Sequence, residues 1–165
     1  MNTKPMMSFG EAVKTCFKKY VDFSGRARRS EFWWFSLLNY IIGACTYALV
    51  SWKMGVQEAL QSQAVEAAFD QEKYNALLAQ AESVDNTFFP LLCLIGIVSL
   101  ALLLPSLAVT VRRLHDTGRS GWLILLLFIP LVNCITGIVL IIFELQDSKP
   151  ETNKFGPSPK YIGEA

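Results

Sequence analysis

The sequence predicts an all-α protein: a polytopic transmembrane helix bundle with three spans, an N-terminal amphipathic helix and a helical extramembrane insert. Two observations support this fold class. Three long runs are apolar and carry no charged residue, and hydrophobic residues make up 52% of the 165-residue chain, which is above the norm for soluble domains. The charged residues are also segregated along the chain, as expected of a protein with two assigned sides. We therefore treat residues 1–165 as a single membrane domain.

The first predicted element is an amphipathic helix over residues 8–20. Ser8 and Glu11 have the spacing of a capping box. Apolar residues then recur at helical spacing on one face, with lysines opposite: Phe9, Ala12, Val13, Cys16, Phe17 and Tyr20. Such a helix either lies in the headgroup plane of a membrane or packs on the protein's own cytoplasmic loop. We favour the interfacial arrangement.

The three apolar runs cover residues 32–52, 88–111 and 121–143. The first would be about 31 Å long at 1.5 Å per residue, which is enough to cross the hydrocarbon core. It begins too far along the chain for a cleavable signal peptide, so it is expected to act as a retained signal-anchor. Pro130 and Asn133 interrupt the third run. A re-entrant hairpin is therefore the alternative to a single kinked span there, and the length of the run favours the span.

The charges assign a side to each polar segment. Residues 1–31 contain seven Lys or Arg and three acidic residues, whereas residues 54–87 contain one Lys and six acidic residues. The positive-inside rule places the N-terminus and the charged turn at 112–120 in the cytoplasm. The 54–87 insert, rich in Ala, Gln and Glu, is expected to be external and helical. Three spans would then leave the polar, Pro- and Gly-containing tail, residues 144–165, outside as well.

Arginines cluster where the apolar runs begin and end. Arg112 and Arg113 are expected to extend the second span and to snorkel toward lipid phosphates. Asp116 can pair with an arginine of its own turn or of the segment before the first span. The following residues form a candidate ion-pair cluster or anionic lipid or ligand site: Arg26, Arg28, Arg29, Arg112, Arg113, His115, Asp116 and Arg119. The structural role, ion pairs that lock the helices, is favoured over recognition of an anionic headgroup or phosphorylated ligand.

No catalytic constellation is visible. His115 and Asp116 are neighbours in sequence, and such an isolated pair is more often structural than a general base with its orienting carboxylate. The chain has one histidine, and its four cysteines lack metal-ligand spacing. There is no P-loop, dinucleotide fingerprint or nucleophile elbow. We therefore expect no catalytic residue, metal or cofactor. Nucleic acid is not an expected partner either, because the basic residues lie at the bilayer.

Three segments carry a resemblance to a known family. They are FSGRARRSEFW at 23–33, RRLHDTGRSGW at 112–122 and NKFGPSP at 153–159. With these motifs the chain resembles a member of domain-of-unknown-function family 805, which comprises small bacterial inner-membrane proteins. The resemblance covers nearly the whole chain apart from residues 54 to about 87, where the acidic insert is longer than the usual connection. It implies a multi-pass protein of the bacterial inner (plasma) membrane with no established biochemical activity.

The predicted function is that of a non-enzymatic scaffold or regulator that interacts with anionic lipid headgroups or with partner membrane proteins. Residues 54–87 would offer the surface for a protein partner, and the arginine-rich side would contact the lipid bilayer. The alternative is a subunit of a small oligomeric transporter or channel. A pore built from three spans would require a homo-oligomer, and the spans lack the mid-membrane acid or base that ion-coupled carriers usually keep.

Overall fold

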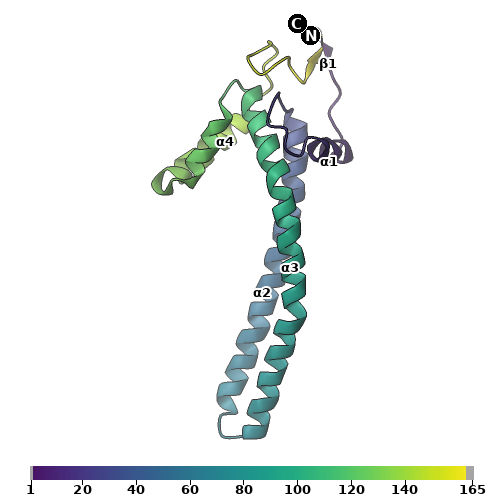
Figure 1. The fold of residues 1–165 in the computed structure, drawn as a ribbon. Helices are drawn as coiled ribbons and strands as arrows, with labels where there is room; N and C mark the ends of the chain where they lie inside the picture. Colours follow the sequence, from purple (N-terminus) through teal and green to yellow (C-terminus); the bar gives the residue numbers. More distant parts are fainter. Residues whose placement is uncertain (1, 163–165) are drawn as a thin grey trace. The chain divides into compact units, whose positions relative to one another are not determined.

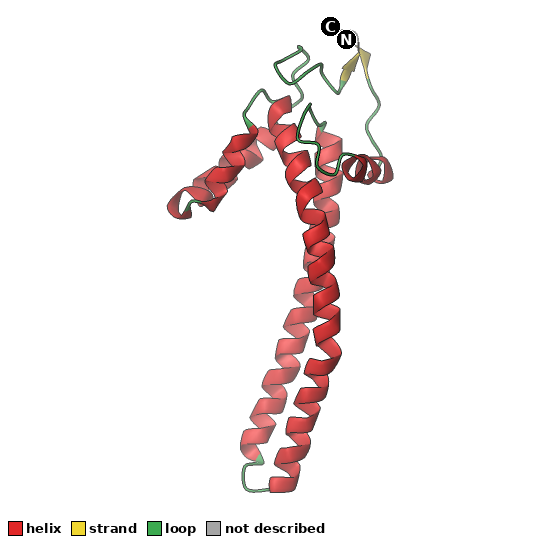
Figure 2. Cartoon of the chain, viewed as in Figure 1, coloured by secondary structure: helices red, strands yellow, loops and turns green. Residues whose placement is uncertain are grey.

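The computed structural model describes residues 2–162, and nearly all of its regular structure is helical (Figures 1 and 2). The elements follow in this order: β1 (Asn2–Thr3), α1 (Phe9–Lys18), α2 (Arg29–Glu66), α3 (Gln71–Asp116), the 3₁₀ helices η1 (Gly121–Phe128) and η2 (Pro130–Val132), α4 (Asn133–Leu145) and β2 (Tyr161–Ile162). The predicted all-α class is confirmed. The chain divides into two compact units, a terminal unit (Met1–Leu38 and Leu102–Ala165) and a hairpin unit (Asn39–Ala101).

The hairpin unit consists of residues 39–66 of α2 and residues 71–101 of α3, which run side by side in opposite directions (Figure 2). Near the turn that joins them, a small core contains Leu60, Ala64, Ala67, Tyr74 and Leu77. Further from the turn, an ion pair and a contact between two aromatic rings join the helices. Residues 54–66 and 71–87 of the insert are helical, and both stretches continue into the apolar runs without a break.

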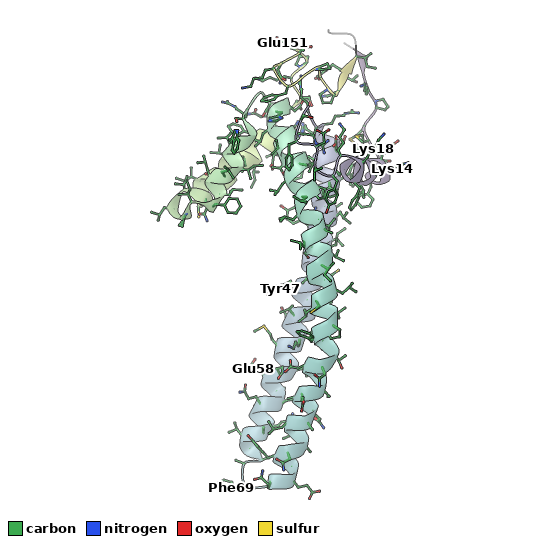
Figure 3. All side chains as sticks on the ribbon, in the orientation of Figure 1. Lys14, Lys18, Tyr47, Glu58, Phe69 and Glu151 are labelled. Carbon is green, nitrogen blue, oxygen red and sulfur yellow. The ribbon has the colours of Figure 1, made fainter. Side chains whose placement is uncertain are left out.

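Helices α2 and α3 are both long and apolar enough to cross a membrane, with 38 and 46 residues. Large apolar side chains on both are exposed to the surroundings of the protein: Tyr40, Ile41, Tyr47, Leu94, Ile97 and Leu100; Tyr47 is labelled in Figure 3. Exposed apolar surface of this extent on a soluble helix would be an aggregation hazard, whereas lipid hydrocarbon solvates it. The two helices therefore have the surface of membrane spans.

The third apolar run is not a single helix. Its first arm is η1, the chain leaves helical geometry at Leu131 with φ of 42°, and α4 begins at Asn133 and packs back on η1 (Figure 1). Pro130 supplies no N–H to continue a helix, which is the physical reason for the break. Eight residues of 3₁₀ helix rise about 16 Å and thirteen residues of α-helix about 20 Å, so neither arm crosses a core of about 30 Å. The single span predicted over residues 121–143 is not confirmed.

Both ends of the described chain lie together in the terminal unit (Figure 1). Strand β1 pairs antiparallel with β2, with Asn2 opposite Ile162 and Thr3 opposite Tyr161, and the Lys4 N–H donates to the Lys160 carbonyl at 2.8 Å. Strands that pair in this way must lie on one side of a membrane. The predicted tail on the side opposite the N-terminus is therefore not confirmed, and the β1–β2 pairing favours the alternative of a re-entrant hairpin at residues 121–143.

Helix α1 begins at the predicted capping box. The Ser8 N–H donates to Glu11 Oε2 at 2.9 Å, and the Glu11 N–H donates to Ser8 Oγ at 3.4 Å. The helix buries Ala12 and Cys16, and burial raises the pKa of the Cys16 thiol to about 12. The N-terminus of α1 is thus fixed by its own side chains, and its apolar stripe is used for packing.

The stripe of α1 packs on the first turns of α2. Phe9 meets Trp34 and Phe17 meets Phe35, each edge to face with ring centroids 5.9 Å apart. Both phenylalanines nevertheless remain about two-fifths exposed, at 41% and 44%. The lysines of the opposite face, two of which are labelled in Figure 3, project outward. The helix packs on its own protein and still leaves aromatic edges and ammonium groups on the surface.

Candidate functional site

The charged residues that end α3 are buried inside the terminal unit. Arg112 and Arg113 lie near the C-terminal end of α3 and are 0% exposed. The prediction that they snorkel toward lipid phosphates is wrong for this structure, because α4 and the segment after it cover this end of α3 and accept hydrogen bonds from Arg113. A buried guanidinium is tolerated only with carboxylate or carbonyl partners. The partners of these arginines therefore define the site.

Arg112 pairs with Glu31, which lies in the first turn of α2. The Nη1 atom of Arg112 is 2.7 Å from Glu31 Oε1, and both side chains are at least 95% buried. Beside this pair, the Ala27 N–H donates to the Arg112 carbonyl at 3.0 Å. An acid at a helix N-terminus and a base at a helix C-terminus each complement the helix dipole. The pair therefore fixes the start of α2 against the end of α3.

Asp116 accepts hydrogen bonds from two arginines. Arg26 Nε donates to Oδ1 at 2.9 Å and Arg113 Nη1 donates to Oδ2 at 2.6 Å, with all three side chains almost completely buried. Both pairings predicted as alternatives for Asp116 are present together. Burial lowers the pKa of the Arg113 guanidinium, and Asp116 opposes this effect. One carboxylate thus joins the segment before α2 to the end of α3.

Backbone carbonyls of the C-terminal segment satisfy the remaining donors of these two arginines. Arg26 donates to the carbonyls of Glu151 at 2.8 Å, Gly156 at 3.2 Å and Lys149. Arg113 donates to the carbonyl of Glu144 at 3.0 and 3.2 Å and to that of Gln146. The donors of Arg26 and Arg113 are therefore used within the protein. These hydrogen bonds hold the segment after α4 in place. They leave Arg26 and Arg113 few free donors for an external anion.

His115 stands apart from the ion pairs. Its ring stacks on Phe155 with centroids 3.7 Å apart and planes at 5°, and its Nδ1 lies 3.2 Å from the Gly25 carbonyl oxygen. Asn153 Nδ2 donates to the His115 carbonyl at 2.9 Å. Burial lowers the pKa of His115, although the hydrogen bond to Gly25 opposes the shift. Residues from all three of the motifs singled out in the sequence meet here.

The other three predicted site residues occupy separate places. Arg28 donates to the carbonyls of Pro5 at 2.8 Å and Lys4 at 2.9 Å, so it anchors the segment before α1. The Arg119 guanidinium lies over the Phe143 ring, 4.7 Å from its centroid. Arg29 is exposed at the start of α2. The eight predicted residues therefore do not form one cluster, because the folded segments distribute them around the end of α3.

Arg28 and Arg29 line a pocket of about 270 Å³ together with residues from both ends of the chain: Lys4, Met6, Ser30, Asp147, Ser148 and Lys160. Sequence reasoning missed Lys4, Ser148 and Lys160. Their position depends on the pairing of β1 with β2, which no local pattern in a two-residue strand reveals. The lysines of the tail were the sequence signal that could have placed it beside the N-terminus, because the positive-inside rule favours a cytoplasmic location for them.

Membrane-length helices with a buried arginine–acid cluster at one end define an integral membrane protein, and comparison with known sequences identifies its family. The chain belongs to the family described as "Protein of unknown function (DUF805)", which it matches over residues 20–157. The family predicted from the three motifs is thus confirmed.

Two relatives give the location of such proteins. The chain is 35% identical to the inner membrane protein YhaH of Escherichia coli strain K12 over 143 residues, which are 87% of this chain and 91% of that protein. It is 33% identical to the inner membrane protein YhaI of the same strain over 144 residues, with the same two coverages. No solved structure matches the chain. The relatives support a location in the bacterial inner membrane.

Proposed function

We propose that this protein is a non-enzymatic scaffold or regulator of the inner membrane that binds anionic lipid headgroups at the cytoplasmic surface. The observation that supports this proposal is that the basic residues fall into two groups, one buried and paired and the other exposed. The buried arginines at the ends of α2 and α3 are paired with acids of the protein itself. The lysines of α1, in contrast, are on the surface, beside exposed aromatic and aliphatic side chains.

The proposed topology has two spans and a re-entrant hairpin. Helices α2 and α3 cross the bilayer, residues 121–143 enter and leave it on the cytoplasmic side, and residues 54–87 lie outside. The excess of Lys and Arg in residues 1–31 supports the cytoplasmic assignment of the terminal unit, and the acidic character of the insert supports the opposite one. This arrangement places α1 at the cytoplasmic headgroup layer.

Helix α1 has the chemistry for that layer. Lys14 and Lys18 are exposed on one side of it, and Phe17, Val21 and Phe23 present exposed apolar surface nearby. A lysine close to an anionic membrane surface contributes roughly 1 kcal/mol of attraction, and the apolar groups can enter the acyl boundary. The lipid partner expected from this chemistry is an anionic phospholipid.

The test is to purify the protein from native membranes and to quantify the bound phospholipids by mass spectrometry. The double variant Lys14→Gln/Lys18→Gln should retain less phosphatidylglycerol relative to phosphatidylethanolamine than the wild type does. Lys73→Gln, which removes an exposed lysine of the hairpin unit, is the matched control and should leave the ratio unchanged. An unchanged ratio in the double variant would refute lipid binding through α1.

A further inference from the structure

The pocket beside Arg29 collects positive charge from segments that are distant in sequence. Lys4 follows β1, Arg28 and Arg29 lie at the start of α2, and Lys160 precedes β2. The β1–β2 pairing and the hydrogen bonds of Arg28 to the carbonyls of residues 4 and 5 bring them together. The fold thus concentrates four cationic side chains around a space of about 270 Å³.

One acid lines the same pocket, and its own neighbours neutralise it. Lys160 Nζ donates to Asp147 Oδ2, and the Ser148 N–H donates to Asp147 Oδ1 at 2.9 Å. These hydrogen bonds hold the pKa of Asp147 below its usual range. Arg29 also contributes to this effect, but the lining has four cationic side chains and one carboxylate, so three positive charges remain uncompensated by an acid of the lining. Within residues 2–162, the Arg29 guanidinium has no hydrogen-bond or ion-pair partner.

Two serine hydroxyls in the pocket wall lack partners. Ser148 is 4% exposed, and its Oγ makes no hydrogen bond with any described residue. The Oγ of Ser30 is likewise shielded and unpaired in the described part of the chain. Most buried polar groups in proteins are hydrogen-bonded, and an unpaired hydroxyl costs free energy. Both residues line the pocket, so rotation about χ1 would bring either shielded hydroxyl to an acceptor bound there.

The pocket also contains the N-terminus of α2, a helix of 38 residues. The first four N–H groups of a helix have no partner within it, and they carry the positive end of the helix dipole. Phosphate groups bind readily at such ends, especially beside an arginine. Together, the helix end, the unpaired hydroxyls and the three uncompensated cations match a tetrahedral oxyanion with several acceptor oxygens.

We propose that this pocket binds one phosphate group, presented either by a phosphomonoester lipid headgroup or by free inorganic phosphate. Arg29 and the hydroxyls of Ser30 and Ser148 contact its oxygens, and Lys4 and Arg28 provide the surrounding positive field. The inference deepens the proposed function and rests on it for the lipid source, because it gives the terminal unit one discrete headgroup site in addition to the surface of α1.

The test measures binding to the full-length protein at constant ionic strength, in detergent for inorganic phosphate and in nanodiscs for lipids. Inorganic phosphate is titrated calorimetrically in a chloride buffer, and phosphatidic acid, a monoester, is compared with phosphatidylglycerol in nanodiscs. We expect saturable binding of inorganic phosphate or of phosphatidic acid, and weakening of at least about tenfold in both Arg29→Gln and Ser148→Ala. Binding of both probes would assign the bare phosphate group as the ligand, and binding of phosphatidic acid alone would assign the lipid source.

The matched control is Ser158→Ala. Ser158 is also buried, at 7% exposure, and its hydroxyl is also unpaired among the described residues, but it does not line this pocket. It should bind phosphate as the wild type does. Equal binding by Ser148→Ala, Arg29→Gln and Ser158→Ala, or no binding of either inorganic phosphate or phosphatidic acid, would overturn the proposal. Lipid retention that still depends on Lys14 and Lys18 would then leave the proposed function standing without the pocket.

Discussion

Asp116 joins the segment before α2 to the end of α3 and, through its two arginines, to the C-terminal segment. It is the shared acceptor of Arg26 and Arg113, and these two arginines in turn hold the carbonyls of the C-terminal segment. Removing one partner of a buried ion pair leaves an uncompensated charge, which typically costs about 3–5 kcal/mol. The free energy of unfolding should therefore be far more sensitive to this carboxylate than to any acid on the surface.

We expect Asp116→Asn to destabilise the protein by that order of magnitude, measured as a fall in Tm in detergent. Asp85→Asn is the control. Asp85 pairs with Lys53 at 2.6 Å, but its side chain is 55% exposed, and solvent-exposed pairs contribute little to stability. Similar Tm values for the two variants would show that the Asp116 cluster is not needed for folding.

Glu144 makes stability depend on pH. Burial raises the pKa of this residue from 4.5 to about 7, although Arg113 opposes the shift. The folded state therefore binds the proton more tightly than the unfolded state does. The resulting stabilisation is complete below about pH 4.5 and is lost as the pH rises to about 7.

Glu144→Gln should remove this dependence. Its Tm should exceed that of the wild type by a few degrees at pH 8, and the difference should shrink or reverse at pH 5. His115, whose pKa is lowered, destabilises the fold at acid pH in both proteins and cancels in the comparison. A Tm difference that is the same at both pH values would exclude a shifted pKa at Glu144.

At the scale of elements, the hairpin at residues 121–143 depends on backbone geometry. Leu131 has φ of 42°, a region in which a leucine is strained and a glycine is not, and its side chain is 95% exposed. Leu131→Gly and Leu131→Ala both remove that side chain, but only the glycine relieves the backbone. In a continuous span the order would be reversed, because glycine costs about 1 kcal/mol relative to alanine inside a helix.

We therefore expect Leu131→Gly to be more stable than Leu131→Ala by about 1 kcal/mol, measured by unfolding in mixed micelles. The sign of this difference separates a hairpin from a single helix without reference to topology. A more stable alanine variant would support the kinked span predicted from the length of the run.

Some elements could be predicted from the sequence alone, and the third apolar run could not. The capping box at Ser8 and the two long apolar helices follow from local patterns, and the structure contains them. The fate of the third run does not follow from its length, because 23 apolar residues can form a span or two short arms. Pro130 pointed to the hairpin, but proline also occurs in kinked membrane helices.

The candidate site was predictable only where it depends on residues that are close in sequence or charge. Pairing of Asp116 with nearby arginines could be expected from charge and proximity in sequence, and it is present. The burial of those arginines could not, since it depends on the return of the chain after Leu145. Glu31 is an example. It lies next to arginines in the sequence, but only the packing of α2 on the end of α3 makes it the partner of Arg112.

At the scale of the whole molecule, the β1–β2 pairing constrains the topology more strongly than hydropathy does. An odd number of spans would separate the termini, whereas Asn2 lies opposite Ile162 and Lys4 donates to the Lys160 carbonyl. Two spans and a re-entrant hairpin satisfy both this pairing and the positive charge of Lys149, Lys154 and Lys160. The excess of basic residues before the first span supports the proposed cytoplasmic location of the shared side.

Paired reporter fusions test this assignment. A fluorescent protein fused after Ala165 should fluoresce, and alkaline phosphatase fused at the same position should be inactive, because the former matures in the cytoplasm and the latter requires the periplasm. The opposite result is expected for the same reporters inserted between Ala67 and Asp70, in the turn between α2 and α3. Active phosphatase after Ala165 would restore the three-span arrangement and would make the β1–β2 pairing impossible in the membrane. Because both reporters are read at both positions, poor expression of one fusion cannot mimic either topology.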